Sequence, residues 1–130
     1  MGVFDALTGG GAKKAKQKLD EGLALLEAGS AKEAIPVFDE ALKLDPKCAD
    51  AFFHRAKAKI QLGKKDEAQK DFSEAAKLDP NHPKAFGERG LLRVQAGKLA
   101  EAVADFTEVR RVVAVEVSED GRRGRIVRRL

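Results

Sequence analysis

The chain has 130 residues, enough for one domain with a buried core, and 35% of them are charged while only 5% are aromatic. The net charge of +4 comes from the two ends of the chain, because the charges of residues 15–116 cancel. This distribution argues only weakly for nucleic acid as a partner and not at all against a protein. Cys48 is the single cysteine, which excludes an internal disulfide and favours a reducing compartment.

Residues 1–12 are predicted to form a flexible N-terminal segment. Met1–Leu7 can form one or two amphipathic turns, either as a membrane-surface or docking peptide or as a frayed end, and Gly9–Gly11 follow. A secretory signal needs an uninterrupted apolar stretch, but Asp5 and these glycines interrupt the apolar residues at the start of this chain. No run approaches the roughly 18 apolar residues that a membrane span requires. We therefore expect a cytoplasmic protein.

Three pairs of helices are predicted between residues 13 and 117, because apolar residues recur there at intervals of three and four. Gly29, Gly63 and Gly97 mark the turn within each pair, as left-handed residues that end a helix. Ser30 and Glu33 have the spacing of a capping box at the start of the second helix. The expected helices cover residues 13–28, 31–44, 48–62, 65–78, 83–96 and 99–113.

The pairs repeat with a period of 34 residues, which indicates a stacked array. Small or aromatic residues recur at matching positions of the units 15–48, 49–82 and 83–116: Gly22, Ala56 and Gly90; Ala34, Ala68 and Ala102; Phe38, Phe72 and Phe106. The first two units also share an alanine and a proline, Ala41 with Ala75 and Pro46 with Pro80, which the third replaces by Val109 and Ala114. The small residues let paired helices approach closely, and the three phenylalanines are expected to fill the core.

This pattern resembles the tetratricopeptide repeat (TPR) family from residue 15 to about 113. The resemblance implies an all-α fold: a right-handed helical-repeat solenoid of about six antiparallel helices plus a C-terminal tail. The large aromatic residue that the family places near position 4 is Phe52 and Phe86 in the last two units, but Lys18 in the first.

The pattern weakens after Val109. Residues 112–117 are rich in β-branched side chains, and Ser118–Gly121 read like a turn. We expect the last helix to extend to about Val117, followed by a basic tail or cap at 118–130; a small hairpin is the alternative. The tail arginines can contact the phosphates of RNA or anionic lipids, or can simply keep the end of the array soluble: Arg122, Arg123, Arg125, Arg128 and Arg129. No aromatic residue lies among them, so base stacking is not expected.

The sequence offers no catalytic constellation. His54 and His82 are the only histidines, Cys48 has no partner at metal-ligand spacing, and no phosphate-binding glycine loop occurs. We therefore expect no enzymatic activity, cofactor, metal or small-molecule substrate.

The resemblance implies a concave groove lined by the first helix of each unit. Its apolar residues would be Leu19, Leu23, Phe53, Ile60, Leu91 and Val94, with His54, Lys57 and Lys84 as polar contacts. An exposed apolar strip usually marks a binding surface, although the chain's own N-terminal segment or tail can also fill it.

TPR domains that clamp the C-terminal carboxylates of Hsp70 and Hsp90 place basic and amide residues at five positions of this groove. Those positions here are Leu19, Leu23, His54, Lys84 and Glu88, of which only Lys84 fits. The resemblance therefore does not extend to that clamp.

We interpret the chain as a non-enzymatic protein–protein interaction module or assembly adaptor that binds a partner peptide or helix in its groove. One alternative is a scaffold that self-associates by end-to-end stacking of repeats. The other is an accessory protein that binds nucleic acid or membranes through the arginine-rich tail.

Overall fold

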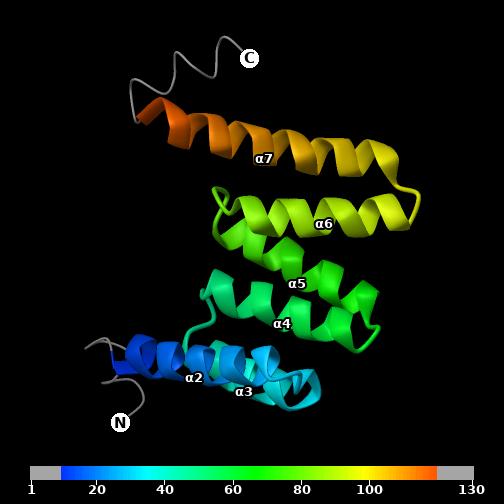
Figure 1. Ribbon diagram of the computed structural model, residues 1–130. Helices are drawn as coiled ribbons and strands as arrows, with labels where there is room; N and C mark the ends of the chain where they lie inside the picture. Colours follow the sequence, from blue (N-terminus) through cyan, green and yellow to red (C-terminus); the bar gives the residue numbers. More distant parts are fainter. Residues whose placement is uncertain (1–9, 120–130) are drawn as a thin grey trace. The chain divides into compact units, whose positions relative to one another are not determined.

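The computed structural model describes residues 10–119, which form six α-helices and no strand. They are α2 (Gly10–Glu27), α3 (Ala31–Leu44), α4 (Ala49–Gln61), α5 (Lys65–Leu78), α6 (Pro83–Gln95) and α7 (Leu99–Glu119) (Figure 1). The all-α helical-repeat fold is thus confirmed. Our expectations for residues 1–9 and 120–130, including the five tail arginines, lie outside the described residues.

The helices fall into two compact units, α2 to α5 and α6 with α7. In the first unit α2 packs on α3 and α4 on α5, and α3 also contacts α4. In the second unit α6 packs on α7. Each predicted pair is therefore an antiparallel hairpin of helices.

Three glycines turn the chain within the pairs. Gly29, Gly63 and Gly97 have φ of 83°, 78° and 79°. In this region the Cβ atom of other residues clashes with the backbone, whereas glycine has no Cβ. At the first turn the backbone N–H of Ser30 donates to the Leu25 carbonyl at 2.8 Å and that of Gly29 to Leu26 at 3.1 Å. The other two turns repeat this helix-ending pattern, as expected from the sequence.

The predicted capping box at Ser30 is wrong. Its side chain makes no capping hydrogen bond; instead its backbone carbonyl accepts from the N–H groups of Glu33 and Ala34. A capping box would also require the Glu33 carboxylate to accept from the Ser30 N–H. That N–H already closes the preceding helix by donating to Leu25, so the two motifs compete for one donor.

Two helices are longer than expected. Helix α2 begins at Gly10, three residues before the predicted start, and Gly11 within its first turn is buried. Helix α7 runs through the β-branched residues 112–117 to Glu119, so the hairpin alternative is not observed. Tertiary packing of Val112, which is buried, outweighs the weak strand preference of these residues.

The core consists mainly of alanines and phenylalanines, at positions where helices approach closely. A Cβ atom built on Gly22 would lie 2.5 Å from the Phe38 ring, and one on Gly90 would lie 2.8 Å from the Phe106 ring. These glycines are therefore required for close helix packing. Phe38 and Phe72 are fully buried, as predicted. Phe106 is not, because 39% of it is exposed on the outer side of α7, where the described chain places no further helix.

Candidate partner-binding surface

The α2 part of the expected groove holds Leu19 and Leu23. Both side chains are half-buried and pack against a core cluster that includes Phe38 and Ala58. They lie one turn apart on α2, so they form a continuous apolar strip. The exposed part of this strip is available for contact, and the rest holds α2 in place.

The α4 part differs from the expectation at Phe53. Only 5% of Phe53 is exposed, and its ring centre lies 5.5 Å from that of Phe72 and 5.0 Å from that of His54. Phe53 is therefore core rather than groove floor, because its ring completes the packing between α4 and α5. His54, Lys57 and Ile60 are half-buried, so part of each side chain is exposed to solvent. The His54 ring also stacks on Phe38 of α3, at 6.3 Å between ring centres.

The α6 part carries the most accessible apolar residues of the expected groove. Leu91 is 52% exposed and Val94 is 44% exposed, and they lie one turn apart on α6. Lys84 is exposed on the first turn of the same helix. Glu88, one turn after Lys84 on α6, is half-buried. The second unit therefore presents an apolar surface with one charge of each sign beside it.

A buried ion network in the first unit was missed at the sequence level. The Arg55 guanidinium on α4 donates two hydrogen bonds to Asp71 of α5, at 2.7 and 2.9 Å, and one to Asp39 of α3, at 2.7 Å. Lys59 Nζ lies 3.0 Å from Asp71. The hydrogen bonds to Asp71 and Asp39 raise the pKa of Arg55 above its ordinary value against the opposing effect of burial. The network therefore ties α3, α4 and α5 together.

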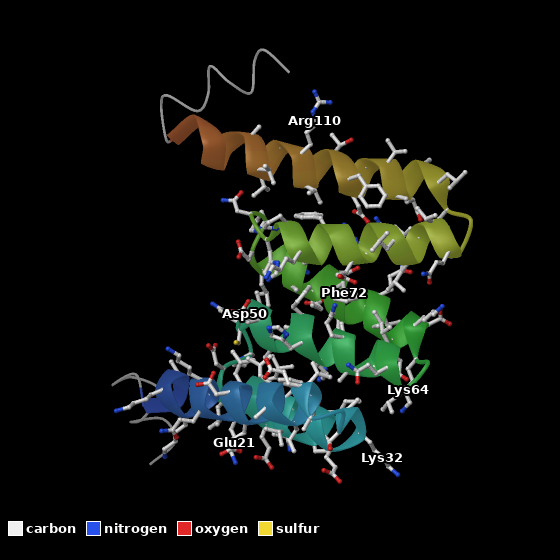
Figure 2. The ribbon with its side chains drawn as sticks, viewed as in Figure 1. Glu21, Lys32, Asp50, Lys64, Phe72 and Arg110 are labelled. Atoms are coloured by element: carbon white, nitrogen blue, oxygen red, sulfur yellow. The ribbon has the colours of Figure 1, made fainter. Side chains whose placement is uncertain are left out.

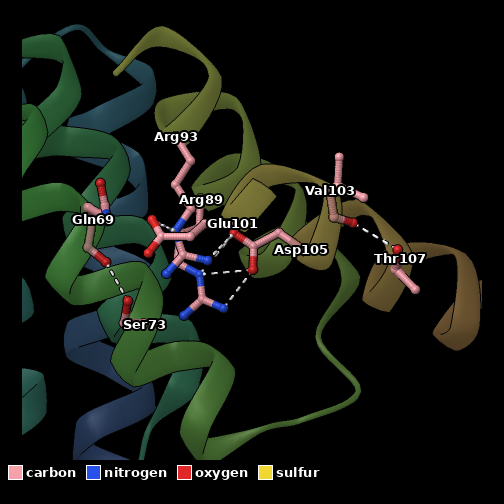
Figure 3. A network of polar contacts seen from close by, with 8 residues as sticks. All are labelled: Gln69, Ser73, Arg89, Arg93, Glu101, Val103, Asp105 and Thr107. Atoms are coloured by element: carbon pink, nitrogen blue, oxygen red, sulfur yellow. Dashed lines mark hydrogen bonds and ion pairs between the residues drawn. The ribbon is translucent and has the colours of Figure 1, made fainter. Parts of the chain in front are cut away.

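The second unit contains an equivalent network around Asp105 (Figure 3). Asp105 of α7 is 2% exposed and accepts hydrogen bonds from Arg89 at 2.7 Å and from Arg93 at 2.8 Å. Arg93 Nε lies 3.9 Å from Glu101. Because all four residues join α6 to α7, the network stabilises the helix pair.

A periodic signal in the sequence could have revealed these networks. Arg55, Lys59 and Asp71 recur 34 residues later as Arg89, Arg93 and Asp105. The first repeat lacks the set, because Glu21, Leu25 and Val37 stand at the same three positions. Charged residues at helix positions normally indicate an exposed face, so the 34-residue recurrence of the set, rather than the residue types, was the available signal.

His82 closes the start of α6. Its Nδ1 accepts a hydrogen bond from the backbone N–H of Ala85 at 3.1 Å, as an N-cap side chain does. In residues 10–119 no group of three or more His, Cys, Asp or Glu side chains is arranged to hold a metal ion. Over the same residues no helix combines the length and apolar character of a membrane span.

Cys48, which precedes α4, is half-buried. Burial raises the pKa of its thiol, and the charges of Asp45 and Asp50 act in the same direction. We therefore expect iodoacetamide to alkylate the folded protein at pH 8 more slowly than the urea-unfolded chain, because less thiolate is present. The Cys48 thiol ionises at a lower pH in the unfolded chain than in the folded protein. The free energy of unfolding should therefore also fall slightly as the pH rises above 9.0, the ordinary pKa of the thiol. Equal alkylation rates in the two states would contradict this assignment.

The paired helices, their shared glycine turns and their 34-residue period define a helical-repeat protein. Residues 25–87 match the model of the tetratricopeptide repeat family. The second TPR domain of Spaghetti (RPAP3), solved bound to the HSP90 peptide SRMEEVD, is 34% identical, with a TM-score of 0.72. The match covers 75% of this chain and 91% of that domain. The chain therefore belongs to the tetratricopeptide repeat family.

Other solved structures show the same fold. The second TPR domain of human RPAP3, in complex with the HSP70 peptide SGPTIEEVD, is 32% identical over 78% of this chain and 85% of that one, with a TM-score of 0.73. MamA has a TM-score of 0.77 over 80% of this chain and 61% of its own, but at 21% identity it supports the fold alone. No protein with a curated description gives a significant match.

Proposed function

We propose that this protein is a non-enzymatic interaction module or assembly adaptor that binds a peptide or helix of a partner protein. Each compact unit would supply contacts from the first helices of its repeats: Leu19, Leu23, His54, Lys57 and Ile60 in the first unit, with Phe53 supporting His54 from the core, and Lys84, Leu91 and Val94 in the second unit. The exposure of Leu91 and Val94 on one face of α6 is the observation that carries the proposal. Exposed apolar residues grouped on one helix face usually mark a binding surface.

Two structures of the second TPR domain of RPAP3, each more than 30% identical to this chain, were solved with peptides of HSP90 and HSP70. They support a protein segment as the class of ligand. The side chains of this chain favour a different peptide chemistry, however. Leu19 and Leu23 are apolar, and the Glu88 carboxylate on α6 would repel a peptide carboxylate. The partner segment is therefore expected to insert apolar side chains rather than an acidic terminus.

The peptide SRMEEVD provides a direct test of this chemistry. We expect it to bind this protein at least about tenfold more weakly than it binds the second TPR domain of RPAP3, because Leu19, Leu23 and Glu88 offer no side-chain donor at three of the five clamp positions. Isothermal titration calorimetry of the two proteins under one buffer condition would measure the difference. Equal affinities would show that the carboxylate is recognised by other residues.

The surface itself can be tested with matched double variants. Leu91→Lys with Val94→Lys should reduce capture of a partner, and the affinity for its purified binding segment, at least about tenfold. Leu44→Lys with Leu78→Lys adds the same charges at exposed leucines that end α3 and α5 and should leave binding unchanged. Equal helicity by circular dichroism would show that both variants fold. If both retain the partner, the binding surface lies elsewhere.

The nucleic-acid or membrane alternative depends on the tail arginines outside the described residues, and it stays a prediction, as does a cytoplasmic location.

A further inference from the structure

Helix α7 carries a row of exposed apolar side chains that its packing on α6 leaves uncovered. We call Leu99, Val103, Phe106, Arg110 and Val113 the outer stripe. Leu99 and Val103 are each 62% exposed, Phe106 is 39% exposed and Val113 is 44% exposed. Their spacing of four, three, four and three residues places them on one side of the helix. Arg110 points away from α6 in Figure 2. The outer stripe is therefore one continuous surface.

In the first repeat another helix covers the equivalent surface. Ile35 and Phe38 of α3 occupy the repeat positions of Val103 and Phe106, and both pack into the core of the first unit. Helix α4 closes this face, because His54 stacks on Phe38 and Arg55 binds Asp39 at 2.7 Å. The outer stripe therefore corresponds in repeat position and apolar character to a face that a further helix covers in the first repeat.

The first repeat of another copy and the C-terminal segment 120–130 could each cover the outer stripe, but neither has complementary chemistry. End-to-end stacking would place it against the first repeat of another copy, but most exposed residues of α2 and α3 are polar or charged: Lys13, Lys14, Lys16, Gln17, Asp20, Glu21, Glu27, Lys32, Glu33, Glu40 and Lys43. The segment 120–130 would bring five arginines towards Arg110, and the stripe offers no carboxylate in return.

The outer stripe fits a second copy of itself. Leu99 and Val113 each lie seven residues from Phe106. Antiparallel pairing about a twofold axis at Phe106 would therefore place Phe106 against its counterpart and each Leu99 against the other copy's Val113. The two Arg110 residues would be separated by about 12 Å along the helix axis, each with its aliphatic stem beside Val103 of the other copy and its guanidinium in the solvent, whereas a parallel pair would bring them together. We propose that α7 pairs in this antiparallel manner with α7 of a second copy, forming a homodimer.

The dimer should be weak and concentration-dependent. The stripe extends over about 21 Å of a single helix, which is small beside the roughly 800 Å² per partner of a standard interface. Sedimentation velocity from about 1 µM to about 1 mM should show a monomer–dimer equilibrium. A wild-type protein that stays monomeric throughout, or assembles into open-ended species, would overturn the proposal.

Two single variants test the register of the helices. Leu99→Glu and Val113→Lys should each weaken dimerisation at least about tenfold, because each buries two unpaired charges in the homodimer. Both residues are exposed in the monomer, so folding should be retained. Mixing the two variants should restore dimerisation, because a mixed dimer pairs the introduced carboxylate of one copy with the introduced ammonium of the other and keeps one native contact between Leu99 and Val113.

Leu44→Lys changes an exposed leucine away from the stripe and serves as the control, with a dimerisation constant close to wild type. A wild-type dimer that both stripe variants leave intact would overturn the interface, and failure of the mixture to associate would overturn the antiparallel register. Deleting residues 120–130 should not reduce dimerisation. These outcomes are independent of whether the groove of the first helices binds a peptide.

Discussion

Replacing Asp105 by alanine should lower the free energy of unfolding by about 3–5 kcal/mol, because it removes one member of a buried ion network. Asp105 accepts from Arg89 at 2.7 Å and from Arg93 at 2.8 Å, and both arginine side chains are less than a fifth exposed. Without the carboxylate these cations remain largely desolvated, and Glu101, 3.9 Å from Arg93, compensates only in part. Urea unfolding followed by circular dichroism would measure the loss.

The ion pair between Arg111 and Glu108 provides the control. Its distance is 2.8 Å, but both side chains are at least 40% exposed. Glu108→Ala should therefore cost less than about 1 kcal/mol, as surface ion pairs do. If Asp105→Ala were no more harmful than Glu108→Ala, the Asp105 network would not be a structural element, and its role would have to be sought in binding.

Phe38→Ala should also lower the free energy of unfolding by about 3–5 kcal/mol, because it leaves a cavity in a tightly packed site. The Phe38 ring is fully buried, and its edge approaches Gly22 so closely that a Cβ there would lie 2.5 Å away. The ring also stacks on His54, so its loss affects α2, α3 and α4 together. The midpoint and slope of urea unfolding would quantify the effect.

Phe106→Ala is the matched control, because it changes the same repeat position on α7. Since 39% of Phe106 is exposed, we expect less than half of the loss seen at Phe38. The comparison should be made at low protein concentration, where α7 is not paired. Equal losses under those conditions would show that Phe106 is covered in the monomer.

The helix pairs could be predicted from the sequence because their signals are local. Gly29, Gly63 and Gly97 adopt the left-handed conformation that their shared phase implied. Gly22 and Gly90 allow the close approach that the repeat pattern required. The periodic apolar residues placed α3 to α6 to within about one residue at each end. These features depend on the backbone and on nearest neighbours alone.

Features that depend on packing between helices were predicted less well. Phe53 had the groove position of its repeat, yet it turns into the core beside Phe72. Phe106 had the core position, yet it is partly exposed because the described chain adds no covering helix. The Arg55 and Asp105 networks were missed because a single charged residue on a helix usually indicates an exposed face, and only the recurrence of the whole set after 34 residues distinguishes it.

The reach of Arg55 has a consequence for how the chain unfolds. Repeat arrays are often treated as coupled modules, each with its own intrinsic stability and an interface to its neighbour. Arg55 belongs to the second repeat but binds Asp39 of the first and Asp71 of its own. Arg55 therefore makes all three of its hydrogen bonds only when both modules are folded, so the stability of one module depends on the other. Unfolding of residues 31–78 should accordingly proceed as a single cooperative transition.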